Sequence, residues 1–389
     1  MKNPAIIVFM IFLVLVVACQ KQEKTVESPE VDTVYVSSKK IRNTIEMTKV
    51  EVVGMNTSYS GHAIVRNEEI LFLDKYFGLV HRIDVYGNVK DIFLGQGEGP
   101  KELDIKLSDG FTILRNGYPA IFGGSLDVHL YSQDWIRDSK FFMSWTGTRT
   151  HQDVYRSDRV DAESSSMYSP DFEKLELKPS YSDPWCVYIP IYSEHPKFNA
   201  FVSDTYYLEG KILAKYNLKT NSVENLFGSR PPIYLQKRYI GHHAFLSFDI
   251  DESENIYVTH EIDSLIYIYQ NDGQLKSVFG KSGINMDTNY TPLRAFDFDE
   301  IERLYYQDKP RRGYYERIFV DAKEDLVFRT YRKGEGRMNG LQIYRNKQCA
   351  VDADVPENFK VLGKIGSKYL SDLIFDEENQ EVYFYTFIL

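Results

Sequence analysis

Clusters of positive charge are missing from this sequence. Its 46 lysines and arginines are outnumbered by 56 aspartates and glutamates, which gives a formal net charge of −10, and no basic block stands out. Because a phosphate backbone is bound by clustered Lys and Arg side chains, we expect no nucleic-acid partner. Stripes of Leu, Ala, Glu and Lys at helical spacing are also scarce, so the sequence does not favour a mainly helical fold.

Cysteine is equally scarce, with three residues in a chain of 389. Cys19 is the predicted lipidation site described below, so only Cys186 and Cys349 remain for a disulfide bond. These two residues lie far apart in the chain and fall in different repeats. We therefore predict two buried free thiols rather than a disulfide.

The common catalytic and metal-binding motifs are missing as well. The sequence has no G-x-S-x-G or H-E-x-x-H, and its scattered acidic residues define no carboxylate pair for glycoside hydrolysis. The stretch Asp249–Asn255 carries oxygen ligands at alternate positions. An EF-hand loop would also need Gly at position 254 and Glu at position 260, where this chain has Glu and His. We expect no cofactor and assign no metal ligand.

The N-terminus has the pattern of an exported lipoprotein. Lys2 is followed by an apolar run, Ala5–Ala18, which is too short for a stable membrane-spanning helix and fits a secretory signal. The run ends in Val16-Val17-Ala18-Cys19, which resembles the bacterial lipobox, where the cysteine is lipidated. We predict a signal peptide over residues 1–18, lipidation of Cys19 and a polar tether over residues 19–33. The alternative is an ordinary signal peptide whose cysteine is incidental.

The residue after the cysteine indicates in which membrane such a lipoprotein is anchored. By resemblance, lipoproteins with Asp at this position tend to stay in the inner membrane, whereas Gln20 indicates the outer membrane. We therefore predict a location in the cell envelope, lipid-anchored to the outer membrane and facing either the periplasm or the surface.

Aromatic residues are abundant: 29 tyrosines and 24 phenylalanines favour strands. A unit of two short apolar strands joined by a polar turn recurs along the chain, followed by a third strand that ends in tyrosine, as in Ile266–Tyr269. The copies of the two-strand unit are Ile64–Leu73, Ile113–Phe122, Phe248–Val258, Ile318–Phe328 and Leu373–Phe384, and a sixth is needed within Tyr188–Tyr216.

Glycine recurs where a fourth strand of the unit would end. An aromatic residue or leucine followed by glycine occurs at Leu94-Gly95, Phe227-Gly228, Phe279-Gly280 and Leu362-Gly363. The stretch FLGQGEGPKEL (Phe93–Leu103) could be a phosphate loop, but its spacing matches neither G-x-G-x-x-G nor G-x-x-x-x-G-K-[ST]. Because similar glycines recur in several units, we predict a structural turn.

Four strands per unit and about six units predict an all-β fold, a six-bladed β-propeller with four-stranded blades, over residues 34–389. The last unit is expected to begin at Leu373, which leaves room for its inner strands only. Its outer strands are therefore expected from residues 34–53, so that strands from both termini close the ring. The polar stretch 147–180 fits no unit and is predicted to be an insertion.

One stretch carries a family resemblance. The segment HRIDVYGNVKDIFLGQGEGPKE (residues 81–102) resembles the end of the first blade in the six-bladed β-propeller lipoproteins of Bacteroides-type bacteria, which commonly have a G-x-G-x-G-P-x-E-like turn there. The resemblance extends over essentially the whole mature chain. It implies a propeller at the cell envelope and, because most of the family has no assigned activity, it implies no chemistry.

Candidate ligand-binding residues follow from the topology of a propeller. Loops that enter the inner strand and loops that join the second and third strands reach the same face, and binding residues concentrate on such loops. The candidates on these loops are Tyr76, Glu98, Arg230, His242, His243, His260 and Arg332.

Two functions remain open. The first is a membrane-tethered, non-catalytic module that binds a small molecule, a glycan or a protein. The second is a propeller enzyme of the lyase, lactonase or transferase type, with a metal or a histidine at the channel. In the second case His242 or His243 would bind the metal together with His260; hydrogen-bonded loop histidines are the simpler interpretation of the same pair.

Replacing the predicted lipidated residue tests the anchor. The Cys19→Ala variant should be released from membranes or accumulate as unprocessed precursor, because no thiol remains for lipidation. Membrane fractionation and fatty-acid labelling measure this. The anchor is wrong if the variant stays in the membrane fraction and the wild type takes up no label.

Overall fold

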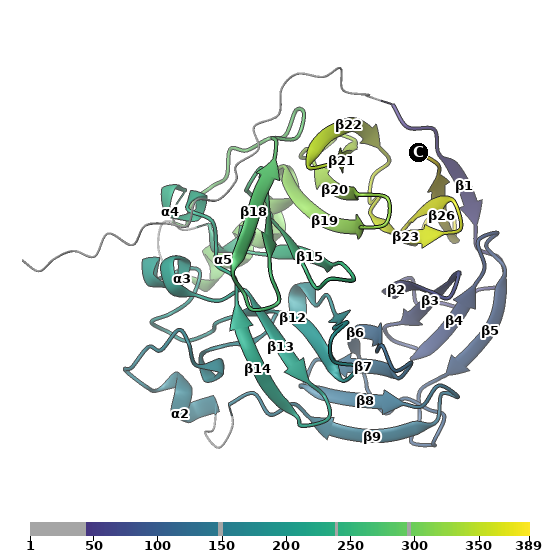
Figure 1. The fold of residues 1–389 in the computed structure, drawn as a ribbon, viewed down its shortest axis with the longest axis horizontal. Coiled ribbons are helices and arrows are strands. Elements are labelled where there is room, and N and C mark those ends of the chain that lie inside the picture. The colour runs from purple at the N-terminus through teal and green to yellow at the C-terminus, as the bar shows by residue number, and fades with distance from the viewer. Residues whose placement is uncertain (1–43, 147–150, 238–239, 294–296) are drawn as a thin grey trace, which may run out of the picture. The chain divides into compact units, whose positions relative to one another are not determined.

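Six antiparallel sheets surround a central channel in the computed structural model (Figure 1), which describes residues 44–146, 151–237, 240–293 and 297–389. Each sheet is one blade with four strand positions, which confirms the predicted all-β, six-bladed β-propeller. The first strand of each blade lies innermost. We call the end of the channel where these inner strands begin the N-side, and the end where they finish the C-side. Cys19, the signal peptide and the tether lie outside the described residues.

Four blades are regular antiparallel meanders. Blade one comprises β2 (Gly61–Arg66), β3 (Glu69–Asp74), β4 (Leu79–Ile83) and β5 (Val89–Leu94). Blade two comprises β6 (Ser108–Ile113), β7 (Pro119–Gly123), β8 (Asp127–Tyr131) and β9 (Arg137–Phe142). Blade four comprises β15 (Leu246–Ile250), β16 (Ile256–His260), β17 (Leu265–Tyr269) and β18 (Leu275–Gly280). Blade five comprises β19 (Tyr314–Asp321), β20 (Leu326–Arg332), β21 (Asn339–Arg345) and β22 (Gln348–Val355).

Blade three has a split inner strand. The short strands β10 (Ser169–Pro170) and β11 (Lys178–Pro179) both pair with β12 (Cys186–Tyr192), and β13 (Leu213–Asn217) and β14 (Ser222–Phe227) complete the blade. The predicted insertion over 147–180 is therefore too long, because residues from 169 onward belong to the blade. Each short strand ends in proline, which has no N–H to continue the ladder, and this explains why the strand pattern was not visible in the sequence.

Blade six contains both ends of the described chain. Its strands are β23 (Val361–Ile365), β24 (Lys368–Ser371) with β25 (Ile374–Asp376), β26 (Glu381–Phe387) and, outermost, β1 (Thr48–Glu51). The predicted closure by strands from both termini is confirmed, since Thr48 faces Thr386 and Glu51 faces Tyr383. The predicted boundary was wrong: the blade begins at Val361, not Leu373, and in the described residues the N-terminal segment supplies one strand.

The recurring glycines are structural at three of the four predicted positions. Gly95, Gly228 and Gly280 lie at the ends of β5, β14 and β18 with φ values of 131°, 73° and 141°, which favour glycine. At Gly280 an added Cβ would also lie 2.4 Å from the backbone oxygen of Ser264. Gly363 is the exception: it lies within the inner strand β23, where it makes room for Val65 of blade one.

Aromatic side chains fill the space between blades. Phe93 of blade one stacks on Trp135 of blade two with ring centroids 5.0 Å apart, and Phe328 of blade five lies 4.7 Å from Tyr369 of blade six. Both faces of a middle strand are therefore covered, and all five residues of β7 are buried. Cys186 and Cys349 are buried free thiols, as predicted.

Nearly all helices interrupt connections on the N-side. They are α2 (His151–Tyr155), η1 (Ser165–Met167), α3 (Asp204–Glu209), α4 (Ile233–Gln236), η3 (Gly241–His243), α5 (Phe298–Arg303), η4 (Leu304–Asp308) and η5 (Lys309–Arg311). A further short helix, η2 (Phe172–Lys174), divides β10 from β11. None of the helices in the described ranges is long and apolar enough to cross a membrane. The helical segments cover one end of the channel and leave the other to the strands and their turns.

Removing β1 tests the closure of the ring. A chain lacking residues 20–53 should aggregate, because the outer edge of β26 loses its ladder partner and the ion pair between Lys49 and Glu381 at 2.8 Å. A matched deletion of residues 20–32 should fold normally, since that segment is predicted to be a tether. Size-exclusion chromatography and thermal melting distinguish the two. A monomeric, cooperatively melting product of the longer deletion would disprove the closure.

Candidate functional site

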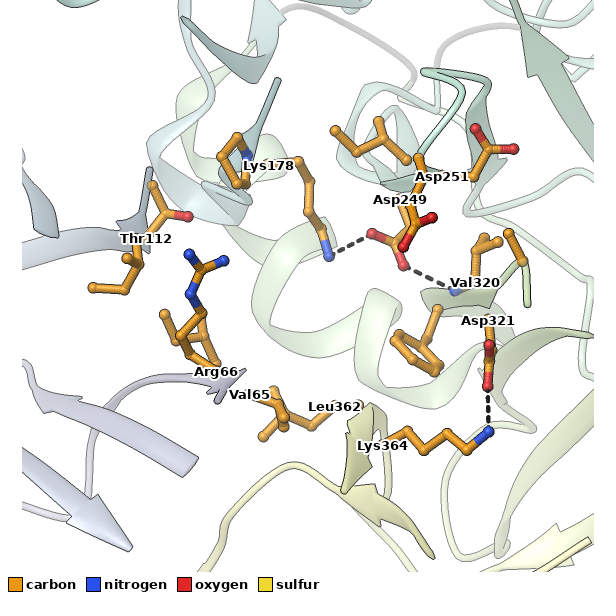
Figure 2. Close-up of a pocket in the computed structure, with 18 of the residues that line it drawn as sticks. Val65, Arg66, Thr112, Lys178, Asp249, Asp251, Val320, Asp321, Leu362 and Lys364 are labelled. Carbon is orange, nitrogen blue, oxygen red and sulfur yellow. Dashed lines mark hydrogen bonds and ion pairs between the residues drawn. The ribbon is translucent and has the colours of Figure 1, made fainter. Parts of the chain in front are cut away.

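The C-side of the channel is an open cavity of about 490 Å³ (Figure 2). The inner strands of all six blades contribute to its wall. Among the labelled residues, Arg66 comes from blade one, Thr112 from blade two, Lys178 from blade three, Asp249 from blade four, Asp321 from blade five and Lys364 from blade six. A ligand in this cavity could therefore contact every blade.

Most charges in the cavity are neutralised by a neighbouring blade. Lys178 of blade three lies 2.9 Å from Asp249 of blade four, whose other carboxylate oxygen accepts a hydrogen bond of 2.8 Å from the backbone N–H of Val320 in blade five. Lys364 of blade six lies 3.0 Å from Asp321 of blade five. These ion pairs connect successive blades around blades three to six.

Blades one and two depart from this arrangement. Arg66 ends β2 and Arg115 follows β6 at the corresponding turn, and no carboxylate in the described chain lies within ion-pair distance of either guanidinium. Burial, and after it the positive charge of Arg115, lowers the pKa of Arg66. The two cations thus line the same part of the wall and neither forms an ion pair in the described chain, and Figure 2 shows Arg66 projecting into the cavity.

An aromatic ring completes this part of the wall. The guanidinium carbon of Arg115 lies 3.3 Å from the ring centroid of Tyr181, a close cation–π contact. Tyr181 is held in turn by Glu254 from blade four, which accepts hydrogen bonds from the backbone N–H groups of Tyr181 at 2.7 Å and Ser182 at 3.0 Å and from the side chain of Ser182 at 2.6 Å. Blade four therefore fixes a side chain of blade three against blade two.

A second cavity of about 390 Å³ adjoins the first between blades one and two. Arg66 and Arg115 line both cavities, so they stand where the two spaces meet. The second cavity also reaches Phe93 and Trp135, the stacked pair between the blades. An extended ligand could follow this groove outward from the channel.

The predicted histidines lie at the other end of the channel and are buried. His242 and His243 form η3 just before β15, have no exposed surface, and their ring centroids are 4.6 Å apart. His260, at the end of β16, is also fully buried and packs against Tyr234, with centroids 6.0 Å apart. The helical connections cover this end, so a diffusing ligand has no direct access to these three rings.

The remaining predicted residues divide between the same cluster and the surface. Arg230 is buried and lies 4.1 Å over the ring of Tyr206. Arg332 ends β20, next to Tyr314, and pairs with Glu316 at 3.4 Å. Register places His260 opposite Leu246 and Arg332 opposite Tyr314, the first residues of two inner strands, so all of these lie on the N-side, as predicted.

Tyr76 and Glu98 belong to blade one and are exposed. Both lie on N-side connections, Tyr76 between β3 and β4 and Glu98 between β5 and β6. Glu98 lies in the glycine-rich turn, where its backbone carbonyl accepts a hydrogen bond from Arg137. They contribute surface rather than the buried cluster, so the structure does not gather the seven candidates into one open site.

Known structures share this fold, although no family model and no curated protein matches the sequence. A Bacteroides vulgatus member of the DUF4221 family aligns with a TM-score of 0.59 and 12% identity, over 89% of this chain and 97% of its own. A Bacteroides fragilis protein described as exported aligns with a TM-score of 0.54 and 11% identity, over 90% and 98%. At these identities the likeness shows the fold alone. A virginiamycin B lyase from Staphylococcus aureus aligns at a TM-score of 0.40, which is too low to support the lyase alternative.

The two arginines of the C-side were detectable in the sequence. Arg66 and Arg115 each precede an asparagine at the turn of their unit, where the units of blades four and five carry Asp251 and Asp321 instead. A position-by-position comparison of the repeats would have shown that these two units carry a positive side chain where others carry a negative one. Their proximity could not be found that way, because it depends on the side-by-side packing of blades one and two.

The carboxylate that holds Tyr181 gives a pH-dependent prediction. Burial alone would raise the pKa of Glu254, but the hydrogen bonds from Ser180 and Ser182 and the charge of Lys215 lower it from 4.5 to about 2. A carboxyl of this kind stabilises the fold above its unfolded pKa and loses that contribution as the pH falls through its folded pKa. Glu254→Gln should therefore lower the free energy of unfolding by about 2 kcal/mol at neutral pH.

The difference between wild type and Glu254→Gln should shrink as the pH falls from 4.5 towards about 2. Urea unfolding at several pH values measures it. Glu252→Gln is the matched control, because Glu252 is an exposed residue of the same turn. An equal loss of stability in both variants, or a difference that does not depend on pH, would contradict this role of Glu254.

Proposed function

We propose that this chain is a lipid-anchored binding module of the cell envelope whose ligand carries a negative charge and binds at the C-side of the channel. The observation that carries the proposal is the pair Arg66 and Arg115, two neighbouring cations in a concave site without a described carboxylate partner. Such a pair is unfavourable until an anion lies between the guanidiniums.

Guanidinium groups suit this role chemically. Each presents a planar set of N–H donors that matches the oxygens of a carboxylate, sulfate or phosphate group in a bidentate arrangement. Tyr181 holds the Arg115 side chain from one side, which reduces the conformational entropy lost on binding. The ion pairs of blades three to six leave little net charge elsewhere in the cavity, so an anion is directed to blades one and two.

The size and composition of the site favour binding over catalysis. Both cavities are as large as typical small-molecule sites. Neither His, Cys nor Ser is among the described residues of the C-side wall, so it offers no histidine base and no such nucleophile. The acidic residues of the wall that form ion pairs are held by lysines, as Asp249 is by Lys178.

The proposed location in the cell envelope depends on the sequence of the N-terminus. The apolar run and Val16-Val17-Ala18-Cys19 support export and lipidation, and Gln20 supports the outer membrane. The Bacteroides fragilis protein of the same fold is described as exported, which agrees with a location outside the cytoplasm. The tether of residues 19–33 would hold the propeller away from the membrane surface.

Binding of simple anions to arginine variants tests the proposal. Isothermal titration with citrate, D-glucuronate, phosphate and sulfate, with D-glucose as the neutral probe, should show saturable binding of at least one anion and none of glucose. Arg66→Gln and Arg115→Gln should each weaken that binding about tenfold or more, since each removes a charge-assisted hydrogen-bond donor.

Arg303→Gln is the control for loss of positive charge, because Arg303 is on α5, at the N-side. Arg66→Lys should recover part of the affinity, since it restores the charge without the planar donor set. The proposal is wrong if no anion binds at millimolar concentration, or if the best anion binds wild type and both glutamine variants equally.

A further inference from the structure

The strongest unexplained cluster lies on the N-side, at the opposite end of the channel from the arginines. Each of His242, His243 and Asp308 offers one ligand atom, and these atoms lie within 4.8 Å of one another. The histidines come from η3, before β15, and the aspartate ends η4, in the segment between β18 and β19. Two connections far apart in sequence thus bring three metal-ligating side chains together.

The imidazole nitrogens lack hydrogen bonds of normal geometry, although His243 Nδ1 makes a close contact with Glu261. Both rings are completely buried, and none of their four nitrogens has a hydrogen-bond partner in the described chain. Buried polar groups are nearly always satisfied, so four unpartnered nitrogens on adjacent residues require an explanation. The nearest carboxylate oxygens are Asp308 Oδ2, 3.8 Å from His242 Nε2, and Glu261 Oε2, 3.4 Å from His243 Nδ1.

The surroundings orient the aspartate. Arg312 donates to Asp308 Oδ1 at 2.8 Å and Thr291 donates to the same oxygen at 2.7 Å. Hydrogen bonds of this kind position ligands in known metal sites. Oδ2, on the side of His242, accepts a longer hydrogen bond of 3.3 Å from the backbone N–H of Thr291 and keeps a second lone pair for a metal.

We propose that His242, His243 and Asp308 bind a divalent transition metal of the zinc class, with the ion joining the loop before β15 to the helical segment 297–311. Two imidazoles and one carboxylate are a ligand set that zinc favours. Zinc–ligand bonds of about 2.1 Å would draw the three atoms inward to about 3.4 Å from one another. Glu261, which pairs with Lys309 at 3.0 Å, is not part of the group whose ligand atoms all lie within 4.8 Å of one another.

The role of this metal is structural. The histidines are fully buried and Asp308 is nearly so, which leaves no path for a substrate. By holding α5, η4 and η5 over the N-side, the ion would keep that end of the channel covered. His260, the third histidine expected from the sequence, does not belong to the cluster, and Asp308 takes its place.

Metal analysis of the full chain tests the site. The purified protein, incubated with zinc and freed of excess by gel filtration, should carry one equivalent by mass spectrometry of the metal. Substitution by cobalt should give the visible absorption of a tetrahedral ion. His242→Gln and His243→Gln should each weaken zinc affinity by more than about 100-fold. A loss of this size exceeds what is expected when the changed residue only contacts a ligand and does not bind the metal itself.

His260→Gln is the matched control, since His260 is equally buried and has two unpartnered nitrogens but lies outside the cluster. It should keep full zinc content. Chelation should lower the melting temperature of wild type and of the control. A wild type that binds no zinc and shows no cobalt spectrum, as expected for rings satisfied by water alone, overturns the proposal. So does zinc binding that both His242→Gln and His243→Gln leave intact.

Discussion

The pairing of β1 with β26 is the constraint on which the rest of the molecule depends. Four residues near the beginning of the described chain pair with residues 383–386 near its end, and this ladder makes an open row of blades into a closed ring. The same segment also reaches blade one, where the Val53 N–H donates to the carbonyl of Gly87 at 2.9 Å. Closure thus positions blade six against blade one and, through Gly363 and Val65, places β2 with Arg66 at the channel.

The two ends of the channel differ because different parts of the chain cover them. Short hairpin turns surround the C-side, so their charged residues face an open cavity. Long connections with helices cover the N-side and bury histidines, lysines and carboxylates together. The two proposals therefore assign an anion to one end of the channel and a cation to the other. The two sites need not communicate, because the strands between them form rigid sheets.

The sequence predicted the repeated parts of the fold. Alternating apolar residues and glycine turns identified four-stranded blades, and the short C-terminal unit indicated closure. The prediction failed where a blade was irregular. Pro170 and Pro179 interrupt the inner strand of blade three, so its strand pattern was not recognised. Leu362-Gly363 matched the pattern of an outer-strand end but lies in an inner strand. The sites were less accessible. Topology placed the histidines on the N-side, but neither their burial nor Asp308 as their neighbour follows from spacing, since both depend on how long connections fold.

The central claim is that an anion binds between Arg66 and Arg115. Crystals soaked with selenate, an analogue of sulfate with a strong anomalous signal, test it most directly. The account predicts an anomalous peak within hydrogen-bond distance of both guanidiniums, and loss of that peak in crystals of the Arg66→Gln variant. Selenate bound only elsewhere on the surface, or an unchanged peak in the variant, would contradict it.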